Sequence, residues 1–135
     1  MIYIYTDGAS RNNPGKSASG YLILDEKGKV VWKDSFYNGI KTNNQAEYIA
    51  VIAALEKALG LSEREAKLFS DSELIINQLK GRYRVKEAGL KGLHGKAKGL
   101  AARFDKLAVE SVPRENRYIS MVDKELNMLL DGLGC

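Results

Sequence analysis

Three acidic residues stand where secondary-structure elements are expected to begin or end. Asp7 follows the β-branched and aromatic run Ile2–Thr6, which is typical of a buried strand. Glu47 falls in the first turns of an expected helix, and Asp71 lies between an expected strand and the helix after it. Functional sites in open α/β sheets gather outside the carboxyl ends of the strands. We therefore expect Asp7 and Asp71 to be neighbours if their strands are adjacent and parallel.

Carboxylates at one sheet edge repel one another, and such a group persists mainly when a divalent cation neutralises it. Oxygen ligands favour hard ions such as Mg²⁺ or Mn²⁺. Taken singly, each acid has a simpler explanation, because Glu47 and Asp71 could complement helix dipoles and Asp7 could form a turn before Gly8. Taken together they favour a metal site, since a turn former gains nothing from two more acids beside it.

The hydrophobic pattern predicts the elements that must hold these acids. Thr42 and Gln45 form a capping box at the start of the first helix, and Gly60, Gly81 and Pro113 are stop signals. A polar loop is expected over residues 10–16, and Asp25–Lys29 is expected to join a hairpin. The expected strands are 2–6, 20–24, 30–32, 66–69 and 107–112, and the expected helices are 42–59, 70–79, 90–107 and 119–130.

The resulting order, βββαβααβα, predicts an α/β fold with a mixed five-stranded sheet flanked by helices. We expect one domain over residues 1–135, with residues 131–135 fraying as a loose tail.

The net charge of +4 is unevenly distributed along the chain. Residues 80–106 contain nine basic residues against two acidic ones. Such a segment would attract a polyanion, although a solvated helical face is an equally good explanation of a charge run alone.

Cysteine usage and the apolar pattern indicate the compartment. The single Cys135 cannot close an internal disulfide, so a reducing, cytoplasmic location is expected. Met1–Tyr5 lacks the features of a secretory signal, and no apolar run approaches the roughly 18 residues of a membrane span. We expect no membrane partner, and a monomer as the default.

Three separated motifs, in order, and the segment after the third resemble those of the type 1 ribonucleases H, in the short form without a hybrid-binding domain or basic protrusion. The motifs are Tyr5–Ser10 with Asn13-Pro14-Gly15, Thr42–Tyr48, Phe69–Ser72 with Asn77-Gln78-Leu79, and Tyr83–Lys86. The resemblance covers nearly the whole chain and implies a ribonuclease H-like fold. It also implies an endoribonuclease that hydrolyses the RNA strand of RNA–DNA hybrids, leaving 5′-phosphate and 3′-hydroxyl ends.

The resemblance implies a fourth carboxylate near the start of the last helix. Asp123, within Val122–Asn127, matches that position, and Glu125 is its competitor. Asp7, Glu47, Asp71 and Asp123 would then hold two Mg²⁺ ions, with Mn²⁺ as a substitute.

The resemblance also implies substrate contacts. Thr42 would meet a DNA-strand phosphate, and Lys86 would help to bind the substrate. The polar residues best placed to reach sugar hydroxyls are Asn12, Asn13, Asn43, Asn44 and Gln45. An equally weighted alternative is that these are turn and cap residues.

One family feature is missing from its usual place. Many relatives carry a histidine in the loop before the last helix, whereas the lone histidine here, His94, falls in the basic third helix. The corresponding loop offers Glu115 for metal or proton traffic and Arg114 or Arg117 for phosphate.

Two rival functions remain open from the sequence. One is a non-catalytic domain of the same fold that binds nucleic acid or a partner protein. The other is an enzyme of the same chemistry with broader substrates, such as double-stranded RNA. The Gly15-Lys16-Ser17 run is not a P-loop, because Ser10 stands where that motif needs glycine.

Overall fold

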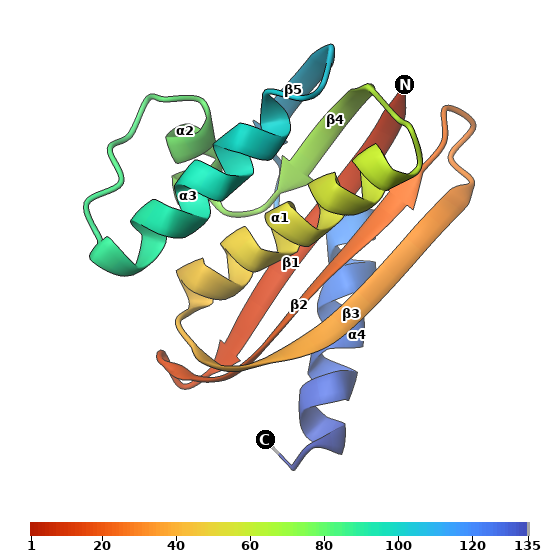
Figure 1. Cartoon of the computed structure of the whole chain (residues 1–135). Helices are drawn as coiled ribbons and strands as arrows, with labels where there is room; N and C mark the ends of the chain where they lie inside the picture. Colours follow the sequence, from red (N-terminus) through yellow and green to blue (C-terminus); the bar gives the residue numbers. More distant parts are fainter. Residues whose placement is uncertain (135) are drawn as a thin grey trace.

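The computed structural model describes residues 1–134 and has the predicted order of elements (Figure 1). The strands are β1 (Ile2–Arg11), β2 (Gly15–Leu24), β3 (Val30–Lys41), β4 (Glu65–Ser70) and β5 (Lys106–Ser111). The helices are α1 (Asn43–Gly60), α2 (Glu73–Leu79), α3 (Ala88–Ala101) and α4 (Arg117–Gly132).

The strands form one five-stranded sheet in the order β3-β2-β1-β4-β5. The pairs β1–β2 and β2–β3 are antiparallel, whereas β1–β4 and β4–β5 are parallel. The predicted mixed sheet is therefore confirmed. Parallel strands need a crossover connection, and α1 supplies the one between the hairpin strands and β4.

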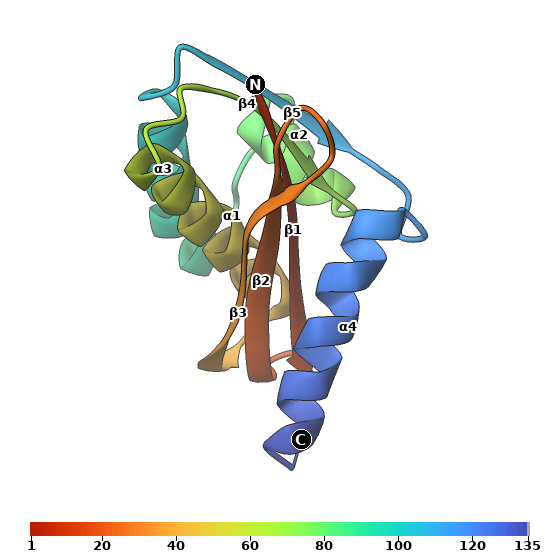
Figure 2. The ribbon, with the colours of Figure 1, turned by 90° about the vertical axis from the view of Figure 1, so that its right-hand side faces the viewer.

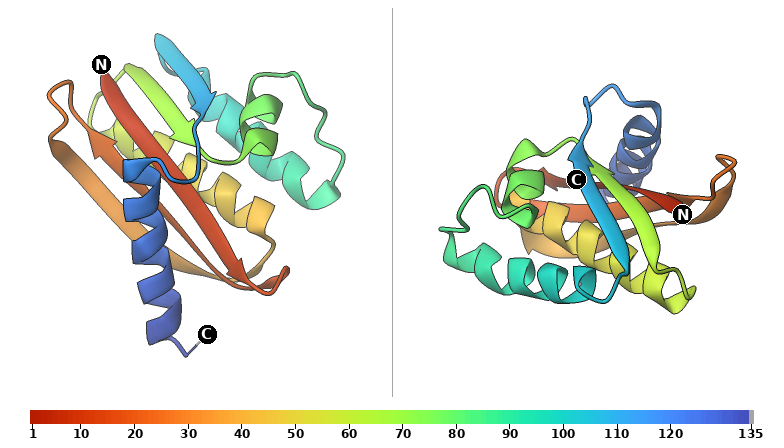
Figure 3. Two further views of the ribbon diagram at one scale, coloured as in Figure 1. Left: turned by 180° about the vertical axis from the view of Figure 1, so that it is seen from behind. Right: turned by 90° about the horizontal axis from the view of Figure 1, so that it is seen from above.

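Helices cover both faces of the sheet (Figures 2 and 3). The apolar sides of α1, α2 and α3 share one buried cluster with the sheet, in which Ile4, Leu55 and Leu68 are almost fully enclosed. On the opposite face α4 packs alone, placing Leu126 and Leu130 against Leu22 of β2. Glu47 on α1 and Asp123 on α4 therefore approach the sheet from opposite faces.

The first strand is longer than predicted. The sequence analysis ended it before Asp7-Gly8, but β1 continues to Arg11 because its antiparallel pairing with β2 runs from Tyr3↔Leu24 to Arg11↔Lys16. Asp7 consequently lies in the middle of a strand. The predicted 10–16 loop shrinks to a turn at residues 12–14, where Asn12 adopts a positive φ of 75°.

The third strand is also longer than predicted, and it forms an edge of the sheet. Val30, Val31 and Trp32 are 41–43% exposed, and Lys57 of α1 places its ammonium 4.0 Å from the centre of the Trp32 ring. An exposed edge strand needs no regular alternation of apolar residues, so the polar stretch up to Lys41 gave no strand signal.

The helix boundaries agree with expectation at the start of the first helix and differ most clearly in the third and last helices. In α1 the capping box is present, with Gln45 N donating to Thr42 Oγ1 at 3.1 Å and Thr42 N donating to Gln45 Oε1 at 2.9 Å. The third helix ends at Ala101 instead of residue 107, because the chain turns to bury Phe104 before β5.

The last helix begins at Arg117, two residues earlier than predicted, because Asn116 accepts hydrogen bonds from Tyr118 N and Ile119 N. At its other end, Asp131 and Gly132 of the predicted loose tail belong to α4, and Cys135 lies outside the described residues. Within residues 1–134 no helix has both the length and the apolar character needed to cross a bilayer.

Three glycines on α3 give a stability prediction. A Cβ built at Gly92, Gly95 or Gly99 meets no described atom within 4 Å. Glycine inside a helix costs about 1 kcal/mol relative to alanine. We expect Gly95→Ala to raise the free energy of unfolding by roughly 0.5–1 kcal/mol, measured by urea denaturation. A fall in stability would contradict the exposed helical placement of Gly95.

Candidate active site

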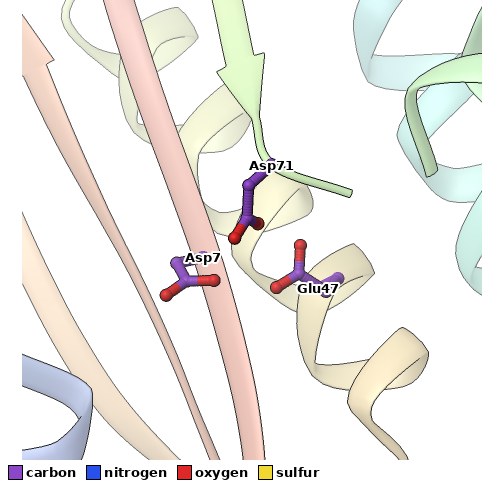
Figure 4. A group of neighbouring side chains, drawn as sticks. All are labelled: Asp7, Glu47 and Asp71. Carbon is purple, nitrogen blue, oxygen red and sulfur yellow. The ribbon is translucent and has the colours of Figure 1, made fainter. Parts of the chain in front are cut away.

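The parallel pairing of β1 and β4 brings two of the predicted acids together. The last paired residues are Tyr5↔Phe69, so Asp7 and Asp71 both lie two residues beyond that pair. Glu47 reaches the same place from α1 (Figure 4). One carboxylate oxygen from each of Asp7, Glu47 and Asp71 lies within 4.8 Å of the others.

Glu47 reaches the strand because Gly8 lets α1 approach closely. A Cβ at Gly8 would lie 2.4 Å from Ala46 C and from Glu47 N, so any larger residue would push the helix away. Gly8 N donates to Glu47 Oε1 at 2.6 Å, and Ser70 Oγ donates to Glu47 Oε2 at 3.2 Å. Glu47 is thus buried and held from both neighbouring strands.

The enclosed carboxylates have perturbed acidity. Burial, followed by the negative charge of Glu47, raises the pKa of Asp7, which also shares a hydrogen bond with Glu47. Burial is likewise the main cause that raises the pKa of Glu47, and the charge of Asp71 adds to it. The pKa of Asp71 is raised by burial, although the nearby Arg114 opposes this. Without a cation, the site therefore resists holding three negative charges.

This donor set fits a hard divalent cation. All donors are carboxylate oxygens, which Mg²⁺ and Mn²⁺ favour. Their burial and mutual repulsion are the penalties that a bound cation would relieve. Asp7, Glu47 and Asp71 are the residues that would hold it.

The two candidates for the fourth carboxylate lie in different places. Asp123, in the second turn of α4, lines one open pocket with Asp7, Glu47 and Asp71, and its charge raises the pKa of Asp7 and of Asp71. In the described chain it is not part of the group within 4.8 Å. Glu125 instead lies 4.0 Å from Lys33 Nζ of β3, outside this pocket. Asp123 is the acid that faces the carboxylate group.

The predicted substrate-binding residues divide into structural and pocket-lining ones. Asn13 Oδ1 accepts from Asn43 N at 3.0 Å, and Asn43 Oδ1 accepts from Ser10 N at 2.8 Å, so both amides tie the β1–β2 turn to the start of α1. Asn43 and Asn44 line the pocket. Of residues 1–134, the pocket lining does not include Asn12, Asn13, Thr42, Gln45 or Lys86.

The pocket also contains residues outside the predicted set. Arg11, Asn127, Ser10 and Ser72 line it. Arg114, one of the two residues that the sequence offered for phosphate, lines it as well. Asn127 could have been found, because it is four residues from Asp123 and therefore on the same helix face. Arg11 could not have been found from the sequence, since the predicted first strand ended before it.

His94 lies away from the carboxylates, on α3. Its Nε2 is 3.2 Å from Gln78 O, and its ring meets Tyr48 edge-on with centres 6.1 Å apart. It is part of the packing of α3 against α1 and α2, in line with its expected role as a helix histidine.

Comparison with known proteins identifies similar chains. A family described as reverse transcriptase-like matches residues 5–123. Ribonuclease HI of Halobacterium salinarum is 38% identical over 84% of this chain, which spans 57% of that relative's length. Three mycobacterial relatives at 38% identity are longer still, and the chain spans 33% of each.

Solved structures agree with these sequence matches. The crystal structure of ribonuclease H1 from the same halophilic archaeon has a TM-score of 0.92 at 36% identity, covering 97% of this chain and 98% of that one. A compost-derived ribonuclease H1, solved in complex with an RNA/DNA hybrid, has a TM-score of 0.85 at 37% identity, covering 96% and 99%.

The family match over residues 5–123, together with the mixed sheet and the carboxylate group that it holds, defines a protein of the reverse transcriptase-like class. Within that class, the chain belongs to the type 1 ribonuclease H family.

The buried carboxylates make stability depend on pH and on metal. Because the folded state raises the pKa of Asp7 and Glu47 above their values in the unfolded chain, it binds more protons. The contribution of these two groups to the stability of the metal-free protein should therefore be greatest below about pH 4. It should fall as the pH rises through their raised pKa values. Thermal melts with EDTA between pH 5 and 8 would measure this, and Mg²⁺ or Mn²⁺ should restore the melting temperature most at pH 8.

Removing one of the carboxylates should raise the stability of the metal-free protein, as metal binding does. Asp7→Asn is expected to stabilise the metal-free protein at pH 8 by roughly 1–3 kcal/mol and to abolish most of the metal-induced gain. The matched control is Glu125→Gln, which removes an exposed carboxylate outside the pocket and should leave both quantities unchanged. A destabilised Asp7→Asn protein would contradict the electrostatic account.

Proposed function

We propose that this chain is a metal-dependent endoribonuclease that hydrolyses the RNA strand of RNA–DNA hybrids. The observation that carries the proposal is the group of three carboxylates, the buried Asp7 and Glu47 and the half-buried Asp71, with oxygens within 4.8 Å of one another. The hybrid bound to the compost-derived relative supports the choice of substrate. A purely structural role for each acid would not explain why two of them are buried beside a third, at a cost in stability.

The residues of the site have separable roles in this proposal. Asp7, Glu47, Asp71 and Asp123 would hold two Mg²⁺ ions, which when bound supply an activated water and charge stabilisation for the departing 3′-oxygen, leaving 5′-phosphate and 3′-hydroxyl ends. Gly8 N and Ser70 Oγ orient Glu47, so that its carboxylate does not rotate away from the other two.

Basic and amide side chains would orient the substrate. Arg114 lines the carboxylate pocket and adds a positive charge beside Asp71, where a scissile phosphate would meet like charges. The side chains of Asn43 and Asn44 line the same pocket and could meet the sugar hydroxyls that distinguish RNA from DNA.

The segment between α2 and α3 exposes the basic side chains of Arg82, Arg84 and Lys86. These side chains suit a sequence-independent contact with substrate phosphates. Cytoplasmic location, a monomeric state, a single domain over residues 1–135 and the remaining substrate contacts stay predictions.

Cleavage of a labelled hybrid tests the proposal. Purified protein with Mg²⁺ should cut the RNA strand, and EDTA should stop the reaction. Asp71→Asn should lower kcat by at least about 100-fold with near-normal hybrid binding, because the loss is in the chemical step. Binding without cleavage by the wild-type chain would favour a non-catalytic domain of the same fold, and cleavage of double-stranded RNA alongside would broaden the substrate class.

Arg114 gives a separate prediction. If it neutralises the reacting phosphate, Arg114→Ala should lower kcat/KM by roughly 10-fold or more, and Arg114→Lys should recover part of the loss. Arg117→Ala is the matched control. Arg117 lies over the Tyr118 ring, 5.4 Å from its centre, and among residues 1–134 it is not part of the pocket lining. Equal effects of the two alanine variants would remove Arg114 from the site.

A further inference from the structure

A line of polar contacts joins the end of β1 to α4. Arg11, the last residue of β1, donates from Nη2 to Asn127 Oδ1 at 3.0 Å and to Asp131 Oδ1 at 2.9 Å. The same nitrogen is 3.4 Å from Asn127 O. Asn127 Nδ2 in turn donates to the backbone oxygen of Asp123 at 3.0 Å. One arginine is thus connected, through a single asparagine, to the residue that carries the fourth carboxylate.

The strand and the helix match in length along this line. Asp7 and Arg11 are four residues apart on one side of β1, a span of about 13 Å at a rise of about 3.3 Å per residue. Asp123 and Asp131 are eight residues apart on one face of α4, a span of about 12 Å at 1.5 Å per residue. Figure 2 shows α4 descending beside the sheet in the same general direction as β1. Asp123 therefore lies in the same pocket as Asp7 at one end when Asp131 bonds to Arg11 at the other.

The apolar contacts beneath α4 are not the only contacts that depend on its register. Val122, Leu126 and Leu130 pack on the β1–β2 surface, and hydrophobic burial is not directional. Gly20 of β2 lets α4 approach the sheet closely, since a Cβ there would lie 2.9 Å from the Leu126 side chain. The directional hydrogen bonds from Arg11 add a polar determinant of the axial position of the helix to this packing.

We propose that Arg11, acting through Asn127 and Asp131, is a positioning residue that sets the axial register of α4 and hence the place of Asp123 in the carboxylate site. This inference rests on the proposed function only in taking Asp123 as a carboxylate of that site. Arg11 and Asp131 are partly exposed, with side-chain accessibilities of 31% and 68%, so their ion pair adds little to global stability. Its effect is on geometry.

The experiment measures metal binding in the absence of substrate. Mn²⁺ is titrated calorimetrically into the full chain and into Arg11→Met and Asp131→Asn. Both variants should bind Mn²⁺ about 3- to 10-fold more weakly, with melting temperatures of the metal-free proteins close to that of the wild type. Relative to the wild type, amide hydrogen exchange in both variants should become faster in α4 and stay unchanged in α1. Arg11→Lys, which keeps the charge but not the fork of donors, should recover part of the affinity.

A matched control is available on the other flank of the same helix. Lys33 of β3 also forms an ion pair with α4, at 4.0 Å from Glu125 Oε1, but away from the carboxylate pocket. Lys33→Met should leave Mn²⁺ affinity unchanged. A loss equal to that of Arg11→Met would show that any α4–sheet pair has the same effect and would overturn the specific role of Arg11.

Two further outcomes separate this inference from its alternatives. If Arg11→Met keeps wild-type Mn²⁺ affinity and only raises the KM for the hybrid, Arg11 contacts substrate directly and the inference is wrong. If Arg11→Met and Asp131→Asn lose Mn²⁺ affinity while the wild type fails to cleave a hybrid, the proposed function fails and the register role stands.

Discussion

The contact between the backbone of β1 and the backbone of α1 at Gly8 is the constraint on which the site depends. A side chain at this position would collide with Ala46 and Glu47. With glycine there, the strand amide itself bonds to the Glu47 carboxylate. A helical acid and a strand acid therefore share one enclosed space, and the parallel register of β1 and β4 delivers Asp71 to the same point. Three elements meet because one residue has no side chain.

This arrangement concentrates charge where the surrounding fold disfavours it. The apolar cluster beneath α1 provides the burial that holds the frame together, and the same burial raises the pKa of the acids at its rim. The helix on the opposite face belongs to a second, smaller apolar cluster. The fourth acid is thus attached to a separate layer of the molecule, and its relation to the other three depends on how that layer sits on the sheet.

Much of this organisation could be predicted from residues with local signals. The capping box of Thr42 and Gln45 fixed the start of α1, and the matched motifs placed Asp7, Glu47 and Asp71 on neighbouring elements. The extension of β1 past Gly8 could not be predicted, because Asp-Gly normally ends a strand and the continued pairing with β2 is a non-local interaction. The role of Arg11 was hidden for the same reason, since its contact with Asn127 arises only when strand and helix are docked.

The long edge strand β3 has a consequence of a different kind. Its outer backbone groups have no neighbouring strand, and Val30, Val31 and Trp32 stand partly exposed along it. Such an edge is a template for pairing with a strand of another molecule. Lys33 and Asp34 interrupt the apolar run immediately afterwards, as charged residues do when they guard against self-association. This border of the sheet therefore bears on self-association and not on the chemistry of the carboxylates.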